Sequence, residues 1–124
     1  MKLFDSELRL MELLWEHPGP DPLTAREISA IAAQRIGWNK NTTYTVLKKL
    51  EAKAALERVE PGFQCIPLIT RQEVQREETR SLLERLFGGS KKALFSALRE
   101  DEAITGDDIA ALRSMIDQAQ GEGK

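Results

Sequence analysis

The chain has 124 residues, of which 41% are hydrophobic and 31% charged, and its formal net charge is −2. This balance is typical of a folded protein with one core, or with a small domain and an appendage, and it argues against a protein that binds any polyanion unselectively. No apolar run approaches the roughly 18 residues that a membrane span requires. No leader sequence is recognisable either, so we expect a cytoplasmic protein.

Residue types that support metal binding or covalent catalysis are scarce. Cys65 is the single cysteine and His17 the single histidine, so we expect no disulfide within the chain, no metal site and no cofactor. Paired carboxylates in an apolar setting, an activated serine or cysteine and a phosphate-cradling glycine loop are all lacking, which argues against an enzyme. We expect Cys65 to be a small apolar filler rather than a reactive thiol.

The N-terminal third predicts two helices. The first spans residues 5 to 16, has Asp5 or Ser6 as its cap, and ends before Pro18. Its apolar side consists of Leu8, Met11, Leu14 and Trp15. The second begins at a capping box formed by Thr24 and Glu27 and ends at Gly37, which can adopt a left-handed conformation. These helices are expected to pack against the helix that follows.

The segment from residue 37 to 56 predicts a short helix with two different sides. The apolar stripe comprises Thr43, Val46, Leu47, Leu50 and Ala54. The opposite side carries amide, hydroxyl and ammonium groups but no acid, which suits phosphates and base edges. Joined by a tight turn to the preceding helix, it forms a helix-turn-helix. The expected DNA-binding residues are Asn39, Lys40, Asn41, Thr42, Tyr44, Thr45, Lys48 and Lys49, with Arg26 before them and Arg58 after them.

Residues 57 to 66 predict two short strands around a Pro-Gly turn, which would form a β-hairpin wing. Helix, helix-turn-helix and hairpin follow one another in the order of a winged-helix domain. The charge is unevenly distributed: seven Lys or Arg stand against three acids between residues 26 and 58, a local balance of +4. Residues 70 to 124 carry eleven acids against nine bases, so DNA is expected to bind the first half.

Three further helices are predicted: from the capping box at Thr70 to Phe87, from near Ser90, and from Thr105 onward. Each has an apolar stripe, but about 45 residues are too few to build a sufficient core alone. We therefore expect pairing with a second copy, the alternative being a subdomain folded back on its own winged helix. The expected dimerisation residues are Leu82, Leu83, Leu86, Phe87, Leu94, Leu98, Ile109, Leu112, Met115 and Ile116.

Short motifs, in order and without large insertions, resemble those of the penicillinase repressor family over nearly the whole chain. They include Glu7-Leu8, Leu14-Trp15, Leu23-Thr24, Arg26-Glu27-Ile28, Gly37-Trp38, Thr42, Thr45, Lys49-Leu50, Pro67-Leu68, Leu86-Phe87-Gly88-Gly89, Asp108-Ile109 and Leu112-Arg113. The resemblance implies a dimeric winged-helix repressor that binds an inverted repeat ahead of antibiotic-resistance genes. It also implies release through a membrane sensor with a metalloprotease domain, which triggers cleavage of the repressor in the helix after the two glycines.

The chain departs from the family pattern at several positions. Tyr44 stands where members often have Arg or Lys, Asn41 where one has Lys, and Ala54 replaces the usual Gly before the wing, which is about two residues shorter. Alignment on the two glycines puts Ser96 and Ala97 at the cleaved bond, where the family has Asn and Phe. The paired Cys-x-Cys motifs of a copper-sensing branch are lacking.

The sequence thus predicts a mainly α fold with a small β-wing: a winged-helix DNA-binding domain over residues 1–69, a C-terminal helical dimerisation domain over 70–120, and a frayed tail over 121–124. We expect a homodimeric repressor whose two recognition helices enter successive major grooves of a double-stranded operator, with a membrane sensor protease as a further partner. One alternative is a winged-helix module that docks on an acidic protein. Another is a DNA-binding regulator that answers a different signal.

Overall fold

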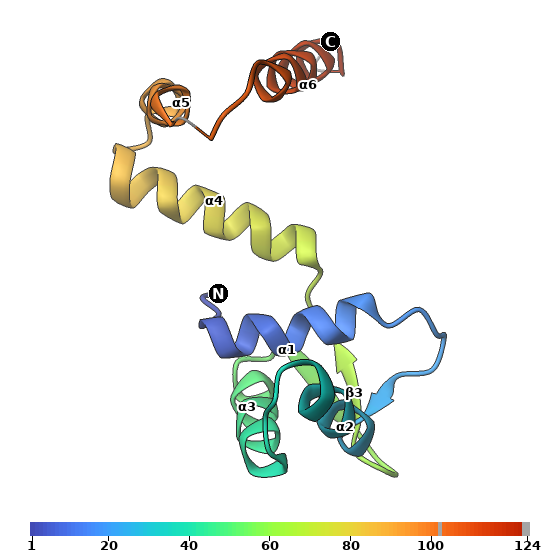
Figure 1. Cartoon of the computed structure of the whole chain (residues 1–124). Coiled ribbons are helices and arrows are strands. Elements are labelled where there is room, and N and C mark those ends of the chain that lie inside the picture. The colour runs from blue at the N-terminus through green and yellow to red at the C-terminus, as the bar shows by residue number, and fades with distance from the viewer. Residues whose placement is uncertain (102, 123–124) are drawn as a thin grey trace. The chain divides into compact units, whose positions relative to one another are not determined.

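Six helices and a small sheet make up the described part of the computed structural model, residues 1–101 and 103–122 (Figure 1). The order of elements is α1 (Asp5–Glu16), β1 (Leu23–Thr24), α2 (Ala25–Arg35), α3 (Lys40–Ala52), β2 (Leu56–Val59), β3 (Gln64–Pro67), α4 (Arg71–Phe87), α5 (Lys91–Glu100) and α6 (Gly106–Glu122). The mainly α fold with a small β-wing is therefore confirmed. None of these helices combines the length and apolar character needed to cross a membrane.

The chain divides into two compact units, Met1–Thr79 and Arg80–Lys124, and the division falls within α4. The sequence predicted a boundary between a DNA-binding and a dimerisation domain at residues 69 and 70. The division into compact units does not test this boundary, which stays a prediction. The predicted tail lies partly outside the described residues, because α6 ends at Glu122 and residues 123 and 124 are not described.

The core of the first unit lies between α1, α2, α3 and the sheet. Its largest fully buried apolar side chains are Leu10, Met11, Ile28, Leu47, Leu50, Leu56 and Cys65. Within α1 the predicted apolar side is only partly right: Met11 and Leu14 are buried, but Leu8 is 37% exposed. Leu10 and Leu13 take its place in the core. The helix carries apolar residues on most of its sides, so helical spacing alone did not identify the buried side.

The helix starts show which local signals were correct. At α2, the Thr24 hydroxyl accepts from the Glu27 amide at 3.2 Å and the Glu27 carboxylate accepts from the Thr24 amide at 3.0 Å, which confirms the capping box. The cap predicted for α1 is wrong, because the helix already begins at Asp5. Its first turn is closed instead by the Glu7 carboxylate, which accepts from the Phe4 amide at 2.7 Å.

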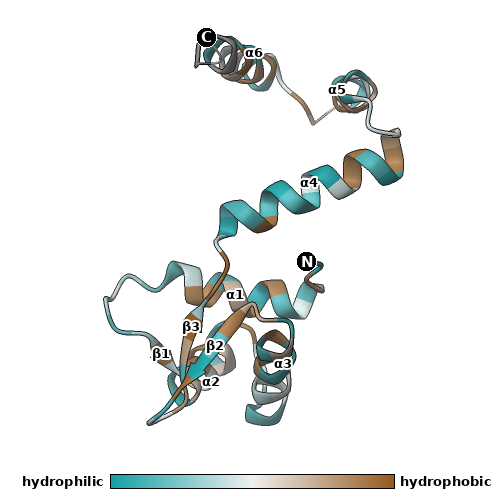
Figure 2. Ribbon diagram, turned by 180° about the vertical axis from the view of Figure 1, so that it is seen from behind, coloured by the Kyte–Doolittle hydropathy of each residue, from teal (hydrophilic) through white to brown (hydrophobic). Residues whose placement is uncertain are grey.

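The sheet contains the predicted hairpin and one strand more. Strands β2 and β3 pair antiparallel, with Arg58 opposite Cys65, and β1 pairs with the other edge of β3, giving the order β1-β3-β2 (Figure 2). Leu23 lies opposite Cys65 and Thr24 opposite Gln64. Two residues are too few to show a periodic pattern, which is why the sequence did not predict β1.

The beginning of α4 is attached to α1 in the first unit. The Trp15 indole nitrogen donates to the Ile69 carbonyl at 3.0 Å, and Arg71 donates to the Glu12 carboxylate at 2.6 Å. Val74 joins the core of this unit. The chain therefore leaves the sheet by a path that α1 fixes.

The second unit consists of the end of α4 with α5 and α6. Gly88 and Gly89 have φ of 57° and 83°, and this left-handed pair ends α4. The Ser90 hydroxyl accepts from the Ala93 amide at 3.0 Å to start α5. Before α6, the Thr105 hydroxyl accepts from the Asp108 amide at 3.2 Å, and the Asp108 carboxylate accepts from the Thr105 amide at 3.0 Å. The predicted helix starts near Ser90 and Thr105 are thus confirmed.

Ala54 does not extend the apolar stripe of α3 but lies in the turn after it, exposed and with φ of 61°. This left-handed conformation costs an alanine roughly 1–2 kcal/mol, whereas glycine adopts it freely. We therefore expect Ala54→Gly to raise the free energy of unfolding by about 1 kcal/mol in chemical denaturation. Ala30→Gly, at an exposed position within α2, is the control and should lower it by about 1 kcal/mol. Destabilisation by both changes would contradict this account of Ala54.

Candidate nucleic-acid interface

The helix α3 presents two chemically distinct sides. Thr43, Val46, Leu47 and Leu50 are buried at 4% exposure or less. The other side is exposed and consists of Lys40, Asn41, Thr42, Thr45, Lys48 and Lys49. No acid lies among them, so the exposed side offers hydroxyl, amide and ammonium groups. It can donate to phosphates and to base edges without placing a like charge beside them.

Asn39 has a structural task at the start of α3. Its side-chain oxygen accepts from the Thr42 amide at 2.8 Å and so caps the helix. Asn39 is exposed, and its amide NH₂ group points to no protein acceptor among the hydrogen bonds of the described residues. The cap therefore fixes where α3 begins and still leaves donor groups at its end.

Tyr44 links α3 to the wing. Its half-buried ring meets the ring of Phe63 edge to face, with the centroids 6.1 Å apart and the planes at 90°. The Lys40 ammonium lies 5.7 Å from the centroid of the Tyr44 ring. Sequence reasoning gave Phe63 no role, because its partner is 19 positions away in the chain and no local spacing relates the two.

The side chain of Arg58, which lies on β2, contacts two other residues of the wing. Its Nε donates to a carboxylate oxygen of Glu60 at 2.8 Å, and its guanidinium carbon lies 4.1 Å from the centroid of the Phe63 ring. The hydrogen bond from Arg58 and a second from the Phe63 amide hold the pKa of Glu60 below its ordinary value. Of the ten predicted DNA-binding residues, Arg58 is the one whose charge is paired with another described residue.

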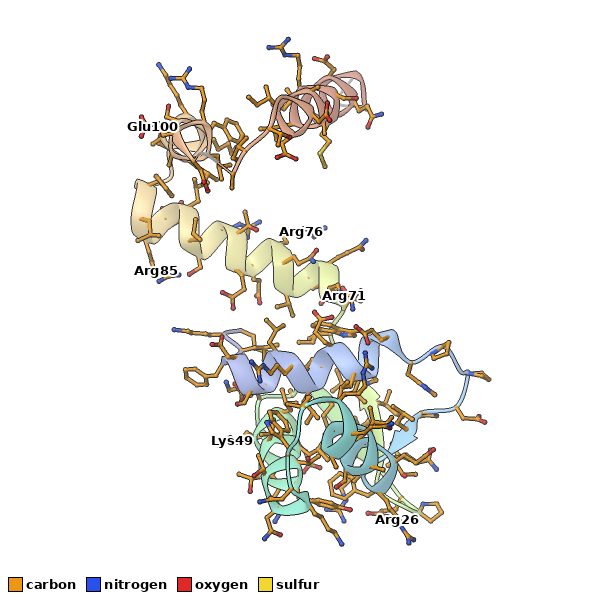
Figure 3. All side chains as sticks on the ribbon, viewed as in Figure 1. Arg26, Lys49, Arg71, Arg76, Arg85 and Glu100 are labelled. Atoms are coloured by element: carbon orange, nitrogen blue, oxygen red, sulfur yellow. The ribbon has the colours of Figure 1, made fainter. Side chains whose placement is uncertain are left out.

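Some of the other Lys and Arg side chains of the first unit form ion pairs and some do not. Arg35 pairs with Glu16 at 3.0 Å, and Lys53 pairs with Glu7 at 2.6 Å. Arg26, Lys40, Lys48 and Lys49 form no ion pair within the described part of the chain. They project from α2 and α3, where Figure 3 labels Arg26 and Lys49. Lys2, Arg9 and Arg76 form no ion pair with described residues either, so four of the seven unpaired Lys and Arg side chains of this unit lie on the helix-turn-helix.

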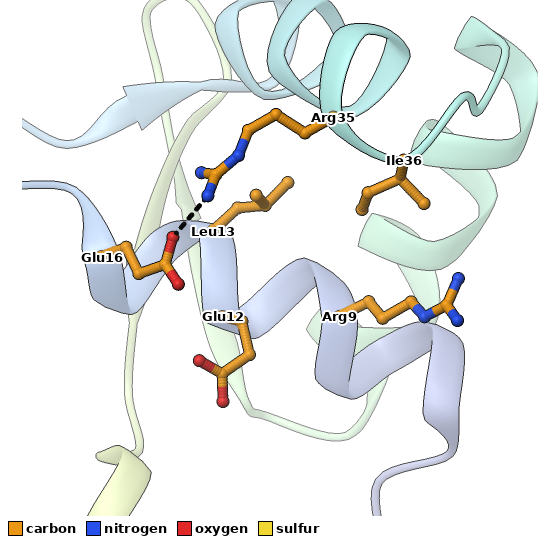
Figure 4. A pocket seen from close by; sticks show the side chains of 6 residues that line it. All are labelled: Arg9, Glu12, Leu13, Glu16, Arg35 and Ile36. Carbon is orange, nitrogen blue, oxygen red and sulfur yellow. Dashed lines mark hydrogen bonds and ion pairs between the residues drawn. The ribbon is translucent and has the colours of Figure 1, made fainter.

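A shallow pocket of about 450 Å³ lies elsewhere in the unit, between α1 and the end of α2. Leu13 and Ile36 form its apolar part, and the Glu16–Arg35 ion pair closes one edge (Figure 4). It shares no residue with the exposed side of α3. The pocket and the candidate interface are therefore separate features.

Cys65 is fully buried in β3, where burial raises the pKa of its thiol to about 11. A thiol that remains protonated is a poor nucleophile and metal ligand. Among the described residues, no cluster of three or more His, Cys, Asp or Glu could hold a metal ion.

In the second unit, the residues predicted for dimerisation leave much of their apolar surface uncovered. Leu86 is 66% exposed and Met115 65%, and no residue of α5 is buried. Leu82, Leu98, Ile109 and Ile116 are exposed as well, while Leu83, Phe87, Leu94 and Leu112 are half-buried. Phe95, which is 39% exposed and three positions from Leu98, was missed because it falls outside the stripe that Leu94 defines.

The predicted cleavage position lies inside α5. Ser96 is half-buried and Ala97 exposed, and both have helical backbone. Proteolysis at this bond would require the helix to open locally, because a protease binds its substrate in an extended conformation.

The match to a protein family places the chain among transcriptional repressors. The sequence profile described as penicillinase repressor matches residues 3–118. Among solved structures, a MarR/EmrR family transcriptional regulator from Acinetobacter sp. ADP1 is 22% identical, with a TM-score of 0.45 and coverage of 94% of this chain and 78% of that one. No curated protein sequence matches the chain.

Proposed function

Because the chain belongs to the penicillinase repressor family and is a transcriptional repressor, we propose that it works as a homodimer whose α3 helices bind an inverted-repeat operator. The observation that carries the proposal is the exposed, acid-free side of α3. Such a helix, the second of a helix-turn-helix, can enter the major groove, where hydroxyl and amide groups distinguish base pairs.

The positive charges of the first unit support binding of DNA by α3. Lys48 and Lys49 on α3 and Arg26 on α2 are exposed and form no ion pair with described residues. Lysine and arginine that contact phosphates fix the position of a protein on the duplex, while base contacts provide selectivity. We therefore assign positioning to these three cations, and base recognition to Asn41, Thr42 and Thr45.

The second unit supports the homodimer. Helices α5 and α6 carry apolar side chains that remain 39% to 65% exposed, among them Phe95, Leu98 and Met115. Exposed apolar side chains concentrated in so small a unit are typical of a protein interface. A second copy would cover the same surface on both subunits and bring two copies of α3 to one operator.

We further propose that the repressor controls β-lactam resistance genes and is released by cleavage between Ser96 and Ala97. The support is the family to which the chain belongs and the place of this bond in the fold. It separates α6, with Ile109, Leu112 and Met115, from the unit that carries α3. A monomeric fragment would lose the gain in affinity that two linked half-sites provide.

The first prediction from this proposal concerns α3. Duplexes selected from a random pool by the purified protein should share an inverted repeat. Thr45→Ala should weaken binding to it by ~1–3 kcal/mol and relax selectivity at one base pair. Lys49→Ala should instead lower the slope of log K against log salt by about one unit. Thermal unfolding should change little in either variant.

Lys92→Ala is the control, since this exposed lysine lies on α5. It should bind the operator as the unaltered chain does. If all three variants bound the operator as tightly as the unaltered chain, the DNA-binding surface would have to lie away from α3. Tight binding to an acidic protein without selectivity for any duplex would favour a protein-interaction module instead.

The second prediction concerns α6. Met115 is 65% exposed, so Met115→Asp leaves each subunit folded but places a charge in the proposed interface. We expect a monomer by light scattering at micromolar concentration, and at least tenfold weaker operator binding because the half-sites are no longer linked. Ser114→Asp, at the adjacent exposed position, should remain dimeric. A full-length chain that is monomeric before any substitution would refute the dimer.

The third prediction concerns release. Cells that produce the repressor are exposed to a β-lactam, and the intact 14.0 kDa chain is followed by mass spectrometry. The proposal expects fragments that end at Ser96 and begin at Ala97, together with induction of the target gene. Ser96→Pro would open α5 and blur the test, so Ala97→Glu, which keeps a good helix former but adds bulk and charge at the cleaved bond, is the better variant for slowing the cut. Induction while the full-length chain persists would exclude cleavage.

A further inference from the structure

At the tip of the wing, Arg58, Glu60 and Phe63 contact one another around the Arg58 guanidinium group. Arg58, on β2, donates from Nε to one carboxylate oxygen of Glu60 at 2.8 Å. The other carboxylate oxygen of Glu60 accepts from the Phe63 amide at 3.2 Å. The Arg58 guanidinium also lies over the Phe63 ring, 4.1 Å from its centroid. Charge, hydrogen bond and ring therefore hold Arg58 toward the tip of the hairpin.

The same ring connects the wing to α3. Phe63 is half-buried and meets Tyr44 edge to face at 6.1 Å, and Tyr44 lies beneath the Lys40 ammonium. Through Phe63, the contacts that hold Arg58 are continuous with the first turns of the recognition helix. The wing is consequently fixed close to the surface assigned to DNA, and the state of Arg58 matters for binding.

We propose that Glu60 keeps Arg58 from binding DNA phosphate and so makes the repressor more selective for its operator. The inference rests on the proposed function of α3. Arginine is a strong, bidentate phosphate ligand, and each phosphate contact adds affinity for every sequence alike. Pairing Arg58 with Glu60 removes one such contact. The wing then carries Glu57 and Glu60 against a single cation, and it contributes no general attraction to DNA.

The strength of the pair suits this role. An exposed ion pair changes an equilibrium constant by about fivefold at most, so Arg58 is not locked in place by Glu60 alone. A phosphate that competed for Arg58 would also have to approach the Glu60 carboxylate, which repels it. Attraction within the wing and repulsion of the phosphate act in the same direction.

The test compares two carboxylates of the wing in the full-length chain. Glu60→Gln and Glu57→Gln each remove one negative charge from an exposed position, but only Glu60 pairs with Arg58. On a 30-bp duplex of random sequence, Glu60→Gln should lower Kd about 3- to 10-fold and steepen the salt slope by about 0.9. Glu57→Gln should change Kd less than about twofold, with the slope unaltered, because it creates no phosphate contact.

Arg58→Gln alone should have little effect on binding to the random duplex, since the charge that it removes is already paired. In the double variant, Arg58→Gln should cancel the gain from Glu60→Gln. The ratio of operator to random-duplex affinity should fall in Glu60→Gln and be restored in the double variant. Thermal unfolding of each variant shows whether the wing remains folded.

Equal gains in Glu60→Gln and Glu57→Gln would overturn the inference, because they would reflect general repulsion alone. A gain that persists in the double variant would overturn it too. In both cases operator binding by the unaltered chain would leave the proposed function standing. Failure of the unaltered chain to bind any duplex would instead refute the proposed function, and this inference with it.

Discussion

The buried carboxylate of Glu7 is the contact on which the arrangement of the first unit depends. It is 1% exposed, and it accepts hydrogen bonds from the Lys53 ammonium at 2.6 Å and from the Phe4 amide at 2.7 Å. Burial acts to raise the pKa of Glu7, but these hydrogen bonds and the charge of Lys53 outweigh it, so the pKa lies below its ordinary value. The Glu7–Lys53 pair therefore stabilises the folded state at pH values above those at which a carboxyl group titrates in an unfolded chain. This contribution is lost as the pH falls through the pKa of Glu7 in the folded state. Lys53 also donates to the Lys2 carbonyl at 2.9 Å, so the N-terminus, α1 and the end of α3 meet at one charge.

This contact and the one at the wing hold α3 at both ends. Lys53 anchors the chain just after its C-terminus, and Tyr44 anchors its first turns through Phe63. Between them, Leu47 and Leu50 are fully buried. Three kinds of contact thus fix the orientation of the helix without using its exposed side. Side chains that do no structural work remain available to bind a partner, and such preorganisation lowers the entropic cost of binding.

The second unit is built differently. Its helices begin with well-formed caps at Ser90 and at Thr105, so each is locally well specified. Yet α5 buries none of its residues, and Met115 on α6 is 65% exposed. Local signals determine where these helices begin, but the apolar side chains of α5 are not buried as those of most stable helices are. A unit of this kind gains stability from association, so the proposed dimer would link the stability of this unit to DNA binding.

The sequence by itself determined the elements whose causes are local. The capping box at Thr24, the cap at Thr105, and the stripe of Thr43, Val46, Leu47 and Leu50 depend on residues within a few positions of one another, so their spacing can be recognised in the sequence. The two-sided character of α3 followed from the same spacing. Membership of the family was likewise recognisable from short motifs in order.

Only the tertiary structure decided the contacts between residues far apart in the chain. It chose Leu10 over Leu8 for the core and joined Glu7 to Lys53, which lie 46 positions apart. It also determined the environment of Arg58, which the sequence offered as a DNA contact like its neighbours, but which the wing directs onto Phe63 and Glu60. The physical reason is that a helix or a cap is stabilised within a few residues, whereas the partner of a charge or a ring is selected by packing among segments that no sequence spacing relates.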